Sequence, residues 1–233
     1  MLMLNARSAP FDDPRAREAV VKAIDMEELN QTAYEGTAEE PKTFFAKESP
    51  FFVPDVELTS HDRQEAQRLF DELAAEGKPV KFTITSFNTL SAKVLMEAIQ
   101  TQLRTYKNVQ VELDVMDSGA ALAALASGSY QAIPAGGLAF DDPEPLLFEH
   151  FHSKSSTDRF GLNDPKLDDA LMKGRKATDM AERQEAYATV ARLITELNPG
   201  LLYLRTSFPL AASQRVGGLK DPYKHGTVLF ADL

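Results

Sequence analysis

The chain has 233 residues, of which 43 % are apolar, and its formal net charge is −10. This length suits one large domain or two small ones, and no run approaches the roughly 18 apolar residues of a membrane helix. The negative charge argues against nucleic acid as a partner, because proteins bind it mainly through Lys and Arg on phosphates. The absence of Cys excludes disulfides, thiolate metal ligands and a Cys nucleophile.

The start of the chain predicts one strand and two helices. Residues 1–4 are too short and uncharged for a signal peptide, and we expect a strand there. Asp12 or Asp13 is expected to cap a helix that begins at Pro14, because proline has no N–H to lose at the first helical position. A second predicted helix covers residues 26–34.

A long segment without helical or strand periodicity, residues 35–59, follows these helices. Loops of this length inside a domain are usually functional or disordered, and its four Phe residues argue against disorder. The rings are Phe44, Phe45, Phe51 and Phe52. They either fill the core beneath the loop or line a ligand cleft, and Phe44 is our candidate for a ligand contact.

The rest of the chain alternates predicted helices and strands. The predicted elements are helix 61–76, strand 80–85, helix 91–105, strand 109–115, helix 119–127, strand 130–135, helices 143–151, 165–173 and 180–197, strand 201–205 and a weak strand 228–231. Helix 91–105 is a crossover long enough for the strands on either side to be parallel. The alternation is typical of an α/β layer fold.

Several segments resemble one protein family. Asn5 after the first strand, Pro-Phe-Asp-Asp at 10–13 and Ala-Ile-Asp at 23–25 resemble the segment that opens the second lobe of family 5 extracellular solute-binding proteins of ABC importers. This is the dipeptide-, oligopeptide- and nickel-binding type. Residues 60–84, 157–194 and 217–230 are similar to further segments of the family, in the same order.

The resemblance implies an α/β fold, a periplasmic-binding-protein-like lobe with a mixed sheet, β-α-β units and flanking helices. It implies that residues 1–233 are the C-terminal lobe of a two-lobed protein whose first lobe and signal peptide are absent from this chain. The implied function is the solute-binding component of an ABC import system, outside the cytoplasm, in the periplasm or at the cell surface with or without a lipid anchor. The implied partners are a peptide or other small solute, the first lobe, and ABC permease subunits.

Two other functions compete with solute binding. The alternative is the ligand-sensing domain of a transcriptional regulator, which a helix-turn-helix before this lobe would indicate. A hydrolase is not favoured, because the chain has no Gly-x-Ser-x-Gly, Walker or His-Glu-x-x-His motif. We expect no cofactor and no metal, since His150 and His152 stand two residues apart and do not share a helix face.

Candidate solute contacts follow from where the strands end, because ligands of open α/β sheets bind outside the carboxyl ends of strands. In the family, the segment at 136–143 reads roughly Trp-x-x-Asp-Tyr-x-Asp-Pro, and peptide binders use its first Asp to hold the ligand's amino terminus. Here Gly136 stands at the Trp position and Ala139 at that Asp, whereas Asp142 matches the second Asp and is also placed to cap a helix. The candidates are Gly136, Gly137, Leu138, Ala139, Phe140 and Asp141.

The turns after two other predicted strands supply the remaining candidates. These are Ser86, Phe87, Asn88 and Ser118. Each turn is also placed to cap the next helix, through Thr89 or Ser91 in the first and Asp117 or Ser118 in the second. A lobe that normally faces a partner and a ligand should expose an apolar patch, and we expect it near Phe44, Phe87 and Phe140.

Overall fold

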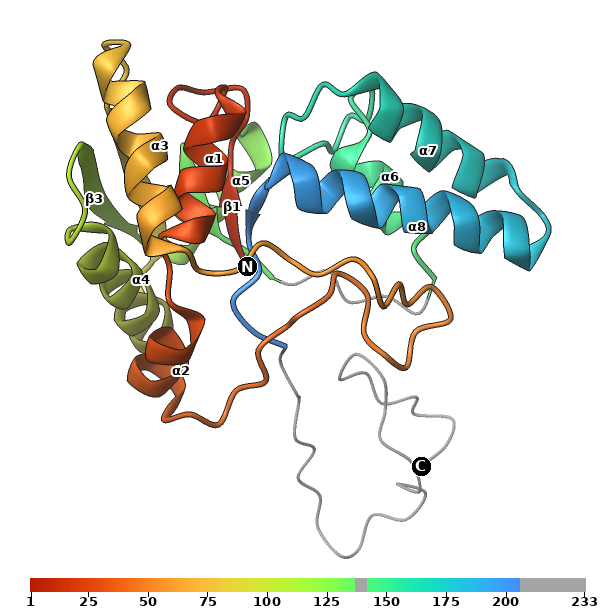
Figure 1. The fold of residues 1–233 in the computed structure, drawn as a ribbon. Coiled ribbons are helices and arrows are strands. Elements are labelled where there is room, and N and C mark those ends of the chain that lie inside the picture. Colours follow the sequence, from red (N-terminus) through yellow and green to blue (C-terminus); the bar gives the residue numbers. More distant parts are fainter. Residues whose placement is uncertain (137–141, 206–233) are drawn as a thin grey trace, which may run out of the picture.

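The computed structural model describes residues 1–136 and 142–205, and a five-stranded mixed sheet lies at its centre (Figure 1). The strands are β1 (Leu2–Leu4), β2 (Val80–Phe87), β3 (Val109–Met116), β4 (Ala132–Pro134) and β5 (Gly200–Leu201), in the spatial order β3-β2-β4-β1-β5. β2 pairs in parallel with β3 and β4, whereas β1 runs antiparallel to β4 and β5. The predicted mixed α/β sheet, with its parallel β-α-β unit, is confirmed.

Helices flank this sheet. They are α1 (Pro14–Lys22), α2 (Met26–Tyr34), α3 (Arg63–Ala75), α4 (Leu90–Leu103), α5 (Ser118–Ser127), α6 (Leu146–Phe151), α7 (Pro165–Lys176) and α8 (Met180–Leu197). All except α6 begin after an Asp or Thr whose side chain accepts a hydrogen bond from the first turn. In the described part of the chain, none of the helices is long and apolar enough to cross a membrane.

β1 lies buried between two neighbours that come from distant parts of the chain. Leu2 pairs with Pro134 of β4 on one side and with Leu201 of β5 on the other. The next residue, Asn5, is 1 % exposed, and its Nδ2 donates to the backbone oxygens of Gly128 and Tyr130 at 3.0 and 2.8 Å. The start of the chain therefore positions both β4 and β5.

The approach of β5 to β1 requires a glycine. A Cβ atom placed on Gly200 would lie 2.3 Å from the backbone oxygen of Leu2, closer than real Cβ contacts come. This contact explains why the strand begins at a residue without a side chain.

One apolar cluster lies on each face of β1. One holds Leu2 and Leu4 with helices α1, α3 and α4, and the other holds Met1 and Met3 with helices α7 and α8. Side chains of a strand alternate between its faces, so this short strand contributes to both clusters.

Three of the four phenylalanines of the irregular segment belong to the second cluster. Phe44 is 8 % exposed, Phe45 and Phe51 are 3 % exposed, and Phe51 meets Tyr187 of α8 edge-on at 5.3 Å. In Figure 1 the segment, drawn in orange, runs beside α8. The expectation that Phe44 belongs to an exposed patch is therefore wrong, because its ring covers the core under the loop.

Two further strands were expected near the end of the chain. The predicted strand 201–205 is shorter, Gly200–Leu201, because the chain then leaves β1 and Arg205 forms an isolated antiparallel bridge with Glu39. The predicted strand 228–231 lies outside the described residues.

Two leucines of α4 test how the helix is held on the sheet. Leu103 is fully buried in the first cluster, whereas Leu90 is 81 % exposed. We expect Leu103→Ala to lower the free energy of unfolding by about 2–5 kcal/mol, because it leaves a cavity. Leu90→Ala, the same substitution in the same helix, should change it by less than about 0.5 kcal/mol. Urea unfolding followed by circular dichroism measures both, and equal losses would contradict this packing.

Candidate functional site

The carboxyl ends of the parallel strands meet at one end of the sheet. β2, β3 and β4 run in the same direction, and β5 shares it because both β4 and β5 oppose β1. The first residue of the chain lies there too, since the backbone N–H of Ala135 donates to the oxygen of Met1 at 3.0 Å. This end of the sheet is where a ligand is expected.

The turn after β2 holds three predicted solute contacts, and the structure does not expose all of them. Ser86 is fully buried, and its Oγ has no hydrogen-bond partner in the part of the chain that the structure describes. Phe87 is half-buried and Asn88 is exposed. Thr89 accepts a hydrogen bond from the N–H of Ala92 at 3.3 Å, which confirms the predicted cap. Ser86 is therefore inaccessible to a solute, and Phe87 and Asn88 stay candidates.

The turn after β3 lies against the first turn. The backbone N–H of Asn88 donates to the oxygen of Met116 at 2.8 Å. Asp117 caps α5 by accepting from the N–H groups of Gly119 and Ala120 at 2.9 and 3.1 Å, and Ser118 is exposed. The structure thus brings Asn88 and Ser118 to one surface.

Apolar side chains are exposed at these turns. Leu90 begins α4 and is 81 % exposed, and Val115, which pairs with Ser86 near the end of β3, is 43 % exposed. Phe87, at the end of β2, is half-buried. Of the rings expected in an exposed aromatic patch, Phe87 is thus partly exposed, Phe44 is buried, and Phe140 lies outside the described residues.

The loop after β4 is described only at its two ends. Gly136 is exposed, and the predicted contacts Gly137, Leu138, Ala139, Phe140 and Asp141 lie outside the described residues. At the other end, Asp142 accepts from the N–H of Glu144 at 3.0 Å in the turn before α6, but it does not cap that helix as predicted, because α6 begins after Pro145 without a side-chain cap. Arg183 of α8 forms two hydrogen bonds to the same carboxylate, at 2.6 and 3.0 Å, and these hold the pKa of Asp142 below its usual value.

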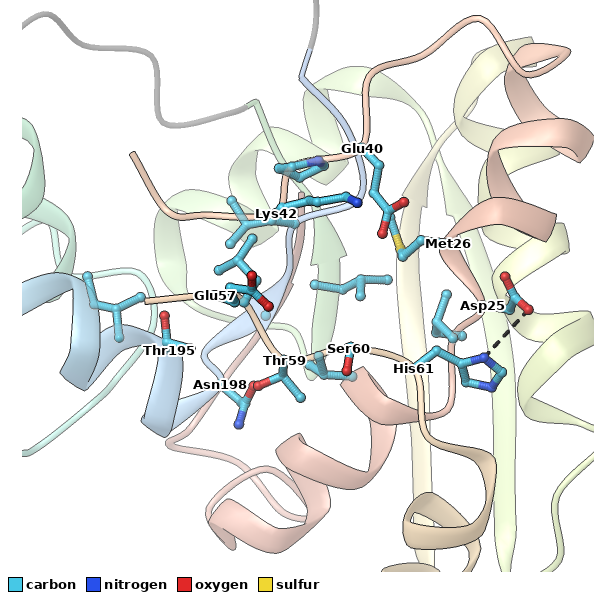
Figure 2. A pocket seen from close by; sticks show the side chains of 18 of the residues that line it. Asp25, Met26, Glu40, Lys42, Glu57, Thr59, Ser60, His61, Thr195 and Asn198 are labelled. Carbon is cyan, nitrogen blue, oxygen red and sulfur yellow. Dashed lines mark ion pairs between the residues drawn. The ribbon is translucent and has the colours of Figure 1, made fainter. Parts of the chain in front are cut away.

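A pocket of about 370 Å³ lies beside β5, the edge strand opposite β3 (Figure 2). It is enclosed by four parts of the chain. These are residues 21–27 between α1 and α2, residues 40–42 and 57–61 of the irregular segment and just beyond it, and residues 194–202 at the end of α8 and along β5. The sequence left open whether the irregular segment is functional, and it did not identify this pocket, because the other parts carry no motif that points to a site.

The walls of the pocket carry polar side chains over an apolar floor. In Figure 2, Thr195, Asn198 and Glu57 are drawn on one side of the pocket and Asp25 and His61 on the other, where the ion pair of Asp25 with His61 measures 3.5 Å. No group of three His, Cys, Asp or Glu side chains in the described ranges is placed to hold a metal ion. The arrangement suits binding of a small molecule.

The ion pair of Asp142 with Arg183 predicts a dependence of stability on pH. Because the folded-state pKa is lowered, the pair stabilises the fold above the unfolded pKa of about 3.9, and the contribution is lost as pH falls through the folded value. Asp142→Asn keeps the side-chain oxygen that accepts from the N–H of Glu144, and we expect it to lower the free energy of unfolding at pH 7 by about 0.5–1 kcal/mol, since the carboxylate is half exposed.

Urea unfolding between pH 7 and pH 3 measures this effect. The variant and the wild type should converge at the acid end. Asp114→Asn removes an exposed carboxylate of β3 that has no ion-pair partner among the described residues, and it is the control. An identical pH profile for both variants would contradict the role of Arg183.

Comparison with known proteins places this fold in a family. The family described as "Bacterial extracellular solute-binding proteins, family 5 Middle" matches residues 1–158. "Probable di/tripeptide-binding protein 5" of Pseudomonas aeruginosa (strain UCBPP-PA14) is 24% identical over 232 residues, which cover 94% of this chain and 43% of that protein. "Probable ABC transporter periplasmic-binding protein SapA" of Escherichia coli (strain K12) is 24% identical over 241 residues, 98% of this chain and 41% of that protein.

The chain therefore spans about two fifths of the length of these curated relatives. Among solved structures, the periplasmic binding protein DppA from Helicobacter pylori in complex with the peptide STSA superposes with a TM-score of 0.76 at 24% identity. That match covers 86% of this chain and 40% of DppA. The chain belongs to the bacterial extracellular solute-binding proteins of family 5.

Proposed function

We propose that this chain is the C-terminal lobe of a two-lobed protein that captures a peptide or another small solute for an ABC importer. The family match over residues 1–158 carries the proposal. The family consists of solute-binding transport proteins, and the chain is proposed to have no catalytic activity. The curated relatives are named as a di/tripeptide-binding protein and a periplasmic-binding protein of an ABC transporter, so a transcriptional regulator is not favoured.

In this proposal the solute lies against the carboxyl end of the sheet, where Phe87, Asn88 and Ser118 are accessible. A first lobe of the same protein closes from the other side. Closure follows binding because only the closed state has contacts from both lobes, and the closed form then docks on the permease subunits. The protein works outside the cytoplasm, as the name of the Escherichia coli relative supports.

Calorimetry tests this function on the complete protein and on this chain alone. The probes are Met-Leu and the tetrapeptide Ser-Thr-Ser-Ala, which occupy two structural relatives. We expect at least one to bind the complete protein, and to bind this chain at least about tenfold more weakly, because the contacts from the first lobe are lost. Asn88→Ala should weaken binding, whereas Asn163→Ala, an exposed position outside the two turns, should not.

Failure of both peptides would restrict the solute to other classes, and binding of none of a panel of peptides, sugars and metal chelates would refute the function. An equal effect of Asn88→Ala and Asn163→Ala would refute the placement of the solute at the turn after β2.

The second expectation concerns how a peptide would be recognised. Ala139 stands where the family's peptide binders carry the Asp that holds the ligand's amino terminus. A charge-assisted hydrogen bond of this kind contributes roughly 1.5–3 kcal/mol, or about 10- to 100-fold in affinity. We therefore expect the complete protein to bind a free and an N-acetylated short peptide with similar affinity. Tight binding of the free peptide alone, measured by calorimetry, would contradict this.

A further inference from the structure

The pocket beside β5 combines acidic and apolar side chains. We propose that it binds a small organic cation, a primary ammonium or guanidinium group on an aliphatic stem. This goes beyond the proposed function, because the pocket lies at the β5 edge of the sheet, with β2, β4 and β1 between it and β3.

The shape of the pocket suits an aliphatic stem. Its volume of about 370 Å³ falls in the range of small-molecule sites. Val21, Ile24, Ile194 and Leu201 line it and are each at most 5 % exposed, so its floor is apolar and well packed. A flexible chain of four or five methylene groups would bury apolar surface against the partly exposed lining residues Met26, Leu58 and Leu202.

The charges around the pocket are mainly negative. Its acidic side chains are Asp25, Glu27, Glu40 and Glu57, and its basic ones are Lys42 and His61. His61 is 3.5 Å from Asp25. Glu40 and Glu57 have no ion-pair partner among residues 1–136 and 142–205. Two carboxylates are thus free to face a cation, and Lys42 alone opposes them.

The C-terminal end of α8 forms part of the pocket wall. The helix is 18 residues long, and Thr195 and Asn198 bring this end to the pocket. Helix C-termini carry a partial negative charge. Here the buried guanidinium of Arg17 donates to the oxygen of Leu197 at 2.9 Å and offsets that charge, so the carboxylates of Glu40 and Glu57 supply the negative field.

One oxygen atom in the pocket wall lacks a partner. Asn198 is 8 % exposed, and its Nδ2 donates to the oxygen of Glu196, whereas within the described ranges nothing donates to its Oδ1. The Oγ1 of Thr195 also has no hydrogen-bond partner in the same ranges, but it is buried beyond the reach of a ligand. An ammonium group has three N–H donors and no acceptor, so it matches the Oδ1 of Asn198 and the carboxylate of Glu57, which line the same pocket (Figure 2).

The proposal is tested on the 233-residue chain with 1,5-diaminopentane, followed by calorimetry and by NMR shifts of the backbone amides. 1,5-Pentanediol is the neutral control of equal length. We expect saturable binding of the diamine at one site, shifts confined to the pocket, weaker binding at high salt, and binding of the diol at least about tenfold weaker. Equal binding of the diol, or shifts elsewhere, would overturn the proposal.

Matched variants make the test specific. Glu57→Gln removes one of the free carboxylates and should weaken the diamine about tenfold. Glu112→Gln removes an exposed carboxylate of β3, at the opposite edge of the sheet, and should leave binding unchanged. Both positions are exposed, and thermal unfolding of each variant verifies the fold. An equal effect of the two substitutions would show that only net charge matters and would overturn the site.

A third probe identifies the source of the cation. N-acetyl-lysine amide presents the same ammonium group on a peptide backbone. Binding of the diamine alone would assign the pocket to free amines, and binding of the lysine derivative as well would assign it to basic side chains of peptides. Binding of neither would refute the proposal while leaving solute capture by the complete protein open to its own test.

Discussion

The structure depends on the pairing of β1 with its two neighbours. β1 is the one strand that links β5 to the β3-β2-β4 part of the sheet. Leu2 and Leu4 are fully buried on one face, and Met3 is 2 % exposed on the other. Three residues thus join two apolar clusters, one built on α1, α3 and α4 and the other on α7 and α8.

This pairing also arranges the two candidate sites. Because β1 runs against both β4 and β5, the carboxyl ends of β2, β3, β4 and β5 all reach the same end of the sheet. The exposed turns follow β2 and β3. The pocket adjoins β5, at the opposite edge of the sheet. At about 4.8 Å per strand, β3 and β5 are roughly 19 Å apart, so a single small molecule does not contact both edges.

Local rules predicted most of the fold. The bounds of α2 and α8 follow from Asp25 and Asp179, because a capping side chain and an apolar stripe are both visible in the sequence. The alternation of apolar and polar residues predicted β2 and β3. It did not predict that Ser86 is buried. Near the end of β2 both Thr85 and Ser86 are buried, so the alternation no longer separates a covered face from an open one.

Features that depend on distant contacts were not predictable in this way. β5 is only two residues long and pairs with the start of the chain, so it leaves no periodic signal. Phe44 lies in a segment without regular structure, where a sequence cannot distinguish a ring that covers the core from one that faces a ligand. The pocket combines four separate parts of the chain, and its acidic residues resemble ordinary surface residues in the sequence.

The position of β1 has a consequence for synthesis of the protein. Leu2 leaves the ribosome long before Leu201, the residue with which it pairs. At the usual 5–20 residues per second, roughly 10–40 s separate the two events. During that interval the apolar run of residues 1–4 has no strand on one side, and α8 cannot yet pack. The pairing of β1 with β5 is therefore completed late, and a chaperone that shields short apolar segments would protect the nascent chain until β5 arrives.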